Sequence, residues 1–129
     1  MSQSSSQVDF QRLSIGIGCS SRATSDDVLA LIKSCVKEVF PDTVLATLDS
    51  RSRMGEAVAN LLGLPLMLFS ASTLALITGT TIESSLALRS SGTRSVAEAS
   101  ALAALGPQAR LVVTRHTGRL CTCAVAVLP

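Results

Sequence analysis

The sequence predicts a three-layer α/β/α sandwich, built on a mostly parallel (mixed) sheet with a C-terminal antiparallel hairpin. Two observations carry this prediction. Strand-like and helix-like segments alternate as far as residue 106, and two apolar strand-like runs then follow one another. Alternation of this kind is typical of parallel sheets covered by helices, whereas two strands with a short connection pair as a hairpin.

The chain is long enough for one domain. It has 129 residues, of which 47% are hydrophobic and 16% are charged. Such a composition can bury enough apolar surface to offset the chain entropy lost on folding. We therefore expect a single domain over residues 12–129, preceded by a disordered tail, rich in Ser and Gln, at residues 1–11.

The first strand is expected over Arg12–Gly18, an apolar run that ends in glycines. Thr24 is a suitable N-cap for the helix that follows, because its hydroxyl can accept a hydrogen bond from an N–H group of the first turn. Pro41 is expected to end this helix, since proline cannot continue the helical hydrogen bonds. Thr43–Leu48 is the second expected strand.

The middle of the chain continues the alternation. A helix near residues 54–62 is closed by Gly63, because glycine favours the left-handed conformation that follows many helices. Pro65–Phe69 is the third expected strand. Ser70 is placed to cap a short helix that runs to about Ile77.

Residues 78–94 are rich in Thr, Ser and Gly, and their sequence is compatible with either a strand or a helical turn. A capping motif then marks the start of the last predicted helix. Ser95 and Glu98 then have the Ser-x-x-Glu spacing of a capping box. The helix that they open is apolar on nearly every side and ends at Gly106, so we expect it to be covered on two faces.

The C-terminal hairpin is expected from two apolar runs, Arg110–Thr114 and Leu120–Leu128. A loop over residues 115–119 joins them and contains His116, the only histidine. The connection is too short for a crossover, so the two strands pair in antiparallel orientation.

Composition argues against several classes of function. The net charge of +2, with no Trp and no Tyr, offers neither the basic surface nor the stacking platforms of a nucleic-acid-binding protein. A run without charged residues between Glu56 and Glu83 has the hydropathy of a membrane span, but Gly63 and Pro65 interrupt it. We therefore expect neither nucleic acid nor membrane as a partner.

The four cysteines are expected to be free thiols in a cytoplasmic protein. The N-terminus is polar and lacks the apolar segment of a signal peptide. Cys121 and Cys123 are spaced i, i+2, which matches neither a redox motif nor a zinc knuckle. We expect no metal site and no cofactor.

Polar and basic residues follow the strands at one edge of the predicted sheet. The carboxyl ends of parallel strands are where ligands bind in open α/β sheets. Arginine forks, hydroxyls and helix N-termini together suit an anion with several carboxylates, or a phosphate. The expected ligand-binding residues are Gly16, Gly18, Cys19, Ser20, Arg22, Thr24, Asp49, Arg51, Ser70, Arg94, Ser95, Glu98 and His116.

The sequence motifs do not predict a catalytic site. Glu98 resembles a catalytic carboxylate, but the capping box accounts for it without catalysis. Neither His116 nor Cys19 has a recognisable partner for acid–base or nucleophilic work. The position of the third glycine in a dinucleotide fingerprint holds Ser21, and there is no Walker lysine, which argues against a nucleotide.

Several segments together resemble a known family. They are Ile15–Ser25, Leu45–Asp49, Leu64–Ser70 and Ser95–Leu102 followed by the hairpin. Their order and spacing resemble the CobE and CbiG C-terminal domain family of cobalamin (vitamin B12) biosynthesis, over about residues 12–129.

The resemblance implies a fold, a pathway and a set of positions. It implies a three-layer α/β/α protein of the cytoplasm that binds or hands on a precorrin or corrin-ring intermediate in the aerobic pathway. Gly16, Gly18, Arg22 and Thr24 match the family's first loop, Asp49 its second, and Ser95 and Glu98 its capped helix. Where the family often has Lys and Ser-Gly before the last strand, this chain has Arg115-His-Thr-Gly118, which leaves the role of the hairpin open.

Three hypotheses follow. In the first, the chain is a non-catalytic binding or carrier module for a precorrin or corrin intermediate. In the second, it is an enzyme, either a hydrolase or a methyltransferase partner, that acts on the same macrocycle. In the third, it is an interaction module that docks onto other cobalamin-pathway enzymes.

Overall fold

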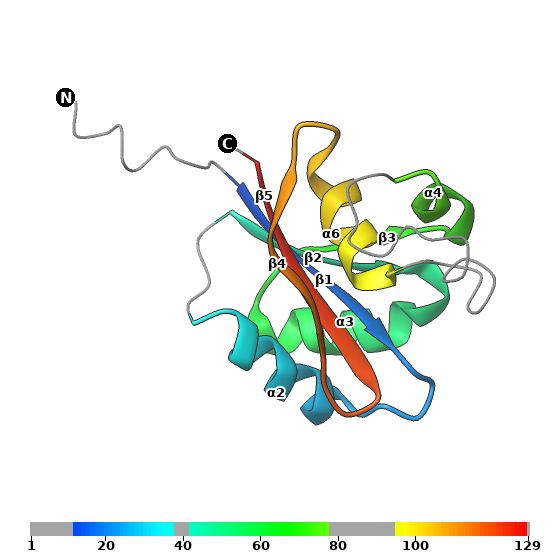
Figure 1. Cartoon of the computed structure of the whole chain (residues 1–129). Helices are drawn as coiled ribbons and strands as arrows, with labels where there is room; N and C mark the ends of the chain where they lie inside the picture. Colours follow the sequence, from blue (N-terminus) through cyan, green and yellow to red (C-terminus); the bar gives the residue numbers. More distant parts are fainter. Residues whose placement is uncertain (1–11, 38–41, 78–94, 129) are drawn as a thin grey trace.

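The computed structural model describes residues 12–37, 42–77 and 95–128. In this part of the chain a five-stranded sheet lies between two layers of helices, as Figure 1 shows. The expected α/β sandwich is therefore confirmed. The strands are β1 (Arg12–Cys19), β2 (Thr43–Leu48), β3 (Leu66–Phe69), β4 (Arg110–Thr117) and β5 (Cys121–Leu128).

The helices divide between the two faces of the sheet. The helix after β1 and the helix after β2 cover one face, and the other two cover the opposite face (Figure 1). They are α2 (Ser25–Cys35), the 3₁₀ turn η1 (Asp49–Arg51), α3 (Ser52–Leu62), α4 (Ala71–Ala75) and α6 (Val96–Leu105).

The sheet has the order β3-β2-β1-β5-β4. β1 pairs in parallel with β2, and β2 with β3, whereas β5 is antiparallel to both β1 and β4. β4 therefore runs in the same direction as β1, and only β5 runs the other way. The mixed sheet and its C-terminal hairpin are as predicted.

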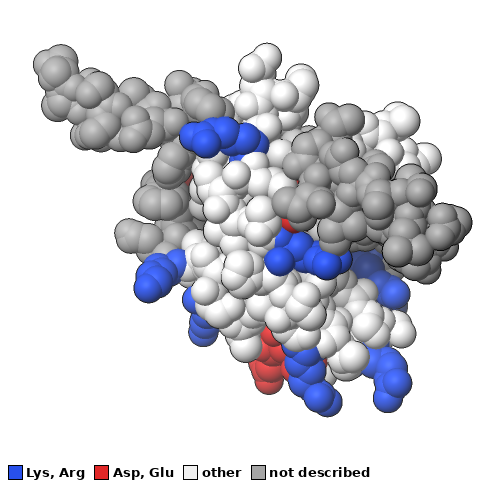
Figure 2. All heavy atoms as spheres, viewed as in Figure 1, with Lys and Arg blue, Asp and Glu red and all other residues white. Residues whose placement is uncertain are grey.

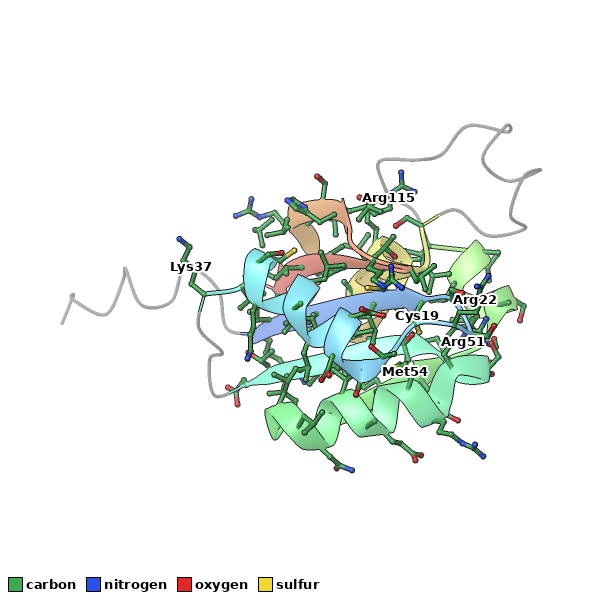
Figure 3. The ribbon with its side chains drawn as sticks, turned by 90° about the horizontal axis from the view of Figure 1, so that it is seen from below. Cys19, Arg22, Lys37, Arg51, Met54 and Arg115 are labelled. Atoms are coloured by element: carbon green, nitrogen blue, oxygen red, sulfur yellow. The ribbon has the colours of Figure 1, made fainter. Side chains whose placement is uncertain are left out.

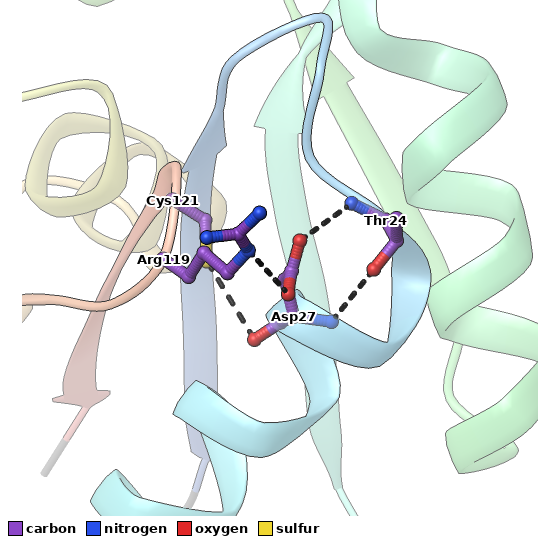
Figure 4. A network of polar contacts seen from close by, with 4 residues as sticks. All are labelled: Thr24, Asp27, Arg119 and Cys121. Atoms are coloured by element: carbon purple, nitrogen blue, oxygen red, sulfur yellow. Dashed lines mark hydrogen bonds and ion pairs between the residues drawn. The ribbon is translucent and has the colours of Figure 1, made fainter.

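The capping box that opens α2 joins Thr24 and Asp27, as Figure 4 shows. The Thr24 hydroxyl accepts from the Asp27 N–H at 3.1 Å, and the Asp27 carboxylate accepts from the Thr24 N–H at 3.0 Å. Thr24 is thus the N-cap that the sequence predicts. The helix ends earlier than expected, because Val36 already has extended backbone; Pro41 lies outside the described residues.

The capping predictions for the two middle helices are confirmed. Gly63 follows α3 in the left-handed conformation, with φ of 71°. Ser70 caps α4, and its hydroxyl accepts from the Thr73 N–H at 3.1 Å. The uncertain stretch at residues 78–94 and the expected tail at residues 1–11 lie outside the described residues.

Helix α6 packs very closely on β1. A Cβ atom on Gly16 would collide with the Ala97 carbonyl oxygen of α6, so only glycine fits there. The Ser14 hydroxyl on β1 donates to the Ala101 carbonyl at 2.5 Å. Most of the helix is buried, as its apolar sequence predicts, because the sheet covers one side and α4 contacts another.

The hairpin differs from the prediction in its boundaries. β4 continues to Thr117, so Arg115 and His116 lie on a strand rather than in the loop. The register of β4 against β5 shifts between Val113 and His116, where the strand bulges. The turn is closed by the Gly118 N–H, which donates to the Cys121 carbonyl at 2.8 Å.

As far as Ile77, the last described residue before the gap, the uncharged run divides between the end of α3, β3 and α4. Among residues 12–37, 42–77 and 95–128, no helix has the length and apolar character needed to cross a bilayer.

Candidate functional site

The loop after β1, the β2–α3 connection and the hairpin turn meet at the carboxyl end of β1, together with the first turns of α2, α3 and α6. From there the chain passes to α2 on one face of the sheet, and the first turn of α6 lies on the other face. In open α/β sheets, ligands bind beside the loops at the carboxyl ends of the strands. Figure 3 places Cys19, Arg22 and Arg51 at this end of the sheet, with Lys37 at the opposite end.

Two hydrogen bonds hold the loop after β1 in place from both sides. The Arg51 Nε–H of the β2–α3 connection donates to the Cys19 carbonyl at 3.0 Å. The Ser20 N–H donates to the carbonyl of Leu120 in the hairpin turn at 2.9 Å. Leu120 has a positive φ of 62°, which is uncommon for a residue with a side chain.

The first hollow lies between this loop and α3 and has a volume of about 380 Å³. Among the described residues that line it, the charged ones are two arginines, and four serines accompany them. We call it the α3-side hollow; its lining residues are Cys19, Ser20, Ser21, Ser25, Ser50, Arg51, Arg53, Met54 and Ala57.

The second hollow lies on the other side of the same loop, beside the hairpin turn and the start of α6. It has a volume of about 410 Å³, and Arg115 is the charged residue among its described lining residues. We call it the hairpin-side hollow; its lining residues are Gly18, Cys19, Ser20, Ser95, Val96, Arg115, Thr117, Gly118, Leu120, Cys121 and Thr122.

The structure brings only part of the expected set into these hollows. Arg51 lines the α3-side hollow, Gly18 and Ser95 line the hairpin-side hollow, and Cys19 and Ser20 line both. The other described members line neither hollow: Gly16, Arg22, Thr24, Asp49, Ser70, Glu98 and His116. Arg94 lies outside the described residues.

Local structure accounts for several of the residues that line neither hollow. Gly16 is buried beneath α6, whose backbone fills the space beside it. Thr24 and Ser70 use their hydroxyls as helix caps. Arg22 is exposed on the loop, where its N–H donates to the Ser20 hydroxyl at 3.1 Å.

Glu98 is fully buried and joins α6 to β4. Its N–H donates to the Ser95 hydroxyl at 3.1 Å, which is one of the two contacts of the predicted capping box. Its carboxylate accepts a hydrogen bond from the Arg115 N–H at 2.7 Å. The carboxylate thus holds the bulged part of β4 beside the hairpin-side hollow.

His116 lies on the exposed edge strand between Arg115 and Thr117. Its neighbours line the hairpin-side hollow, whereas His116 does not. The Nδ1 atom lies 3.0 Å from the Thr114 carbonyl oxygen, which favours the tautomer that is protonated at Nδ1.

All four cysteines are free thiols: Cys35 ends α2, and the other three lie on β1 and β5 in the core that α2 covers. Cys19 and Cys121 are register partners on β1 and β5. Burial raises the pKa of the Cys19 thiol, with partial opposition from the Arg51 guanidinium, and burial also raises the pKa of Cys121. In the described part of the chain, no group of three or more His, Cys, Asp or Glu side chains is arranged to hold a metal ion.

Two arginines of the hollows are absent from the residues that the sequence analysis singles out as ligand-binding. Arg53 lies in the first turn of α3, two positions after Arg51, and lines the same hollow. Arg115 lies near the end of β4, and β4 runs in the same direction as β1. The direction of β4 identifies Arg115 as a site residue, because it brings the end of that strand to the carboxyl edge of the sheet.

The charged side chains that line the hollows are basic. Figure 2 shows arginine and lysine side chains separated by broad uncharged surface, with an acidic patch beside a basic side chain at the bottom of the view. Of the residues that the structure describes, neither hollow has an aspartate or a glutamate in its lining. Unpaired guanidinium groups in polar hollows attract carboxylates and phosphates.

The fold and the two hollows define a class: an α/β sandwich protein with arginine-lined hollows at the carboxyl edge of its sheet. A sequence model of the family described as "Cobalamin synthesis G C-terminus" matches residues 13–126. The chain therefore belongs to this cobalamin biosynthesis family. No curated protein sequence matches the chain.

Solved structures agree with this assignment. CobE, from the cobalamin (vitamin B12) biosynthetic pathway, is 26% identical with a TM-score of 0.76, over 91% of this chain and 90% of CobE. The cobalamin biosynthesis protein chiG from Agrobacterium tumefaciens str. C58 is 31% identical with a TM-score of 0.65, over 90% and 98% of the two chains.

A third, longer structure shares the fold. It is a putative cobalamin biosynthesis protein G homolog from Sulfolobus solfataricus, 20% identical with a TM-score of 0.70. The match covers 92% of this chain but only 37% of that one, so the fold recurs there as one part of a larger protein.

Proposed function

We propose that this chain binds a precorrin or corrin-ring intermediate of the aerobic cobalamin pathway in the cytoplasm and hands it on to a pathway enzyme. The observation that carries the proposal is the pair of arginine-lined hollows on either side of the loop after β1, in a chain of this family. A precorrin or corrin acid is a flat, apolar macrocycle with carboxylates around its rim. Arginine forks and hydroxyls are the groups that recognise such carboxylates.

The size of the hollows supports binding at the rim of the ligand. Pockets that enclose a drug-sized ligand have volumes of about 300–1,000 Å³. Hollows of about 380 and 410 Å³ are at the low end of this range and suit the acid side chains of a macrocycle better than the whole ring. The ring itself would lie across the open edge of the sheet, where a partner enzyme could take it over.

An enzyme that modifies the same macrocycle is the alternative. Hydrolysis needs a nucleophile or an activated water, a base, and stabilisation of the developing charge. The pKa of Cys19 is raised by burial, which reduces its thiolate fraction, and His116 lines neither hollow. These features support binding without turnover.

Anaerobic titration with precorrin and corrin acids, followed by visible absorbance, tests the proposal. We expect saturable binding at a stoichiometry of one ligand per chain. Mass spectrometry of the ligand after long incubation with catalytic amounts of protein then separates the two candidate functions. An unchanged ligand mass supports the carrier, whereas time-dependent loss of mass, or methylation in the presence of S-adenosylmethionine, would establish the enzyme.

A further inference from the structure

Arg51 is anchored at one end of its guanidinium group. Its Nε–H donates to the Cys19 carbonyl at 3.0 Å, so the plane of the guanidinium is tied to the loop after β1. A guanidinium has five N–H donors, and this bond uses one of them. The two terminal amino groups remain for a ligand in the α3-side hollow, where Ser20 and Ser50 add hydroxyls.

Arg115 is held in a comparable way, through its backbone. The buried Glu98 carboxylate accepts the Arg115 N–H at 2.7 Å and fixes the bulged strand beside the hairpin-side hollow. The same hollow contains the hydroxyl residues Thr117 and Thr122. Each hollow thus combines an arginine with a hydroxyl-bearing wall, and neither has a carboxylate among its described lining residues.

The two hollows share one wall. Cys19 and Ser20 line both, so the hollows lie back to back across the end of β1. The bonds from Arg51 and to Leu120 fix this wall from both sides, which fixes the spacing of the two hollows. A rigid ligand with acid groups on neighbouring parts of its rim can therefore place one carboxylate in each.

We propose that the two hollows take two carboxylates of one ligand, and that Arg51 and Arg115 are the residues that select the acid form over the amide form. This inference rests on the proposed function, because it treats the macrocycle as the rigid spacer between the two acids. An amide neutralises the ligand and replaces an acceptor oxygen with a donor, so an arginine fork rejects it.

Two corrins that differ only in their rim test the inference: one with free peripheral acids, and the same corrin with those acids converted to primary amides. Affinities are measured with the unaltered protein and with Arg51→Ala, Arg115→Ala and the double variant. Arg110→Ala is the matched control, because Arg110 is an exposed arginine on β4 that lines neither hollow.

We expect the acid corrin to bind at least about tenfold more tightly than the amide corrin, since charge-assisted contacts to both carboxylates are lost in the amide. Each single variant should weaken binding of the acid by about tenfold, and the double variant by about the product of the two. The amide corrin should lose little further affinity in any variant. Arg110→Ala should bind like the unaltered protein.

Equal affinity for the two corrins would overturn the inference and leave the proposed function standing. Full affinity of Arg115→Ala for the acid corrin would also overturn the inference, because the α3-side hollow alone would then account for binding of the acid. Failure of the unaltered protein to bind either corrin would overturn both proposals. The acid–amide comparison needs no variant, so the inference stays falsifiable even if a substituted chain does not fold.

Discussion

The Glu98 carboxylate accepts a hydrogen bond at 2.7 Å from the Arg115 N–H, and so connects the first turn of α6 to the edge strand β4. The two residues are 17 positions apart, and the carboxylate is fully buried. A strand that bulges loses some of its regular partners, and the side-chain acceptor supplies one for this N–H group. Glu98 therefore acts on the site through Arg115.

Replacing Glu98 should separate its acceptor role from its charge. Glu98→Ala leaves the Arg115 N–H without this partner, so we expect the free energy of unfolding to fall by about 1–3 kcal/mol. Glu98→Gln keeps an acceptor oxygen and should recover part of this loss. Urea unfolding measures both, and Glu56→Ala on the exposed side of α3 is the control. A stability of Glu98→Ala equal to that of the control would show that the bond contributes nothing.

Gly16→Ala should destabilise the domain through the contact between β1 and α6. The added Cβ would collide with the backbone of Ala97, which no change of rotamer can move away. We expect a loss of about 1–3 kcal/mol in the free energy of unfolding. In Gly18→Ala the new atom would mainly meet the side chains of Thr122 and Val96, which can shift, so its loss should be smaller. A larger loss for Gly18→Ala than for Gly16→Ala would show that the tightest contact between β1 and α6 does not lie at Gly16.

Thr24→Ala and Arg119→Ala both remove a contact to Asp27, yet only the first should matter for stability. The Thr24 hydroxyl caps α2, and loss of such a cap costs about 0.5–2 kcal/mol. Arg119 lies 3.7 Å from the Asp27 carboxylate with 78% of its side chain exposed, and such surface pairs contribute little (Figure 4). Thermal unfolding of the two variants measures the difference, and a larger loss for Arg119→Ala would reverse this ranking.

Local signals in the sequence predict most of the fold. The starts of three helices are predicted from single polar residues, Thr24, Ser70 and Ser95. Each has a short side chain that accepts a hydrogen bond from an N–H group of the same helical turn. The end of α3 is also predicted from one residue, because Gly63 favours the left-handed backbone conformation that closes the helix. These contacts span only a few positions, so the sequence alone contains them.

The site depends on contacts between distant segments, and the sequence analysis recovers less of it. A glycine at the end of a strand suits a ligand and a packed helix equally well, and only the position of α6 assigns Gly16 to packing. Likewise, Arg115 reaches the carboxyl edge because β4 runs in the same direction as β1, which follows from the antiparallel pairing of β5 with both strands. The predicted hairpin boundary is wrong, because pairing with β5 extends β4 to Thr117.

The buried thiols should make the stability of the domain fall in alkaline solution. Burial raises the pKa of Cys19 and of Cys121 above the ordinary value of 9.0. Burial raises the pKa of Cys123 further, and the neighbouring Cys35 adds to this effect. In the unfolded chain the same thiols regain an ordinary pKa, so above that pH the unfolded state binds fewer protons than the folded state. The stabilisation is therefore complete below about pH 9 and is lost as the pH rises toward the folded-state pKa values.

We expect the free energy of unfolding, measured in urea under reducing conditions, to decrease from pH 8 to pH 10. The chain has no tyrosine to titrate in this range, and the lysines, Lys33 and Lys37, are exposed. Cys123→Ala should be less stable at pH 8, because it loses packing, but its stability should depend less on pH. A pH dependence as steep as that of the unaltered protein would assign the alkaline loss to groups other than the Cys123 thiol.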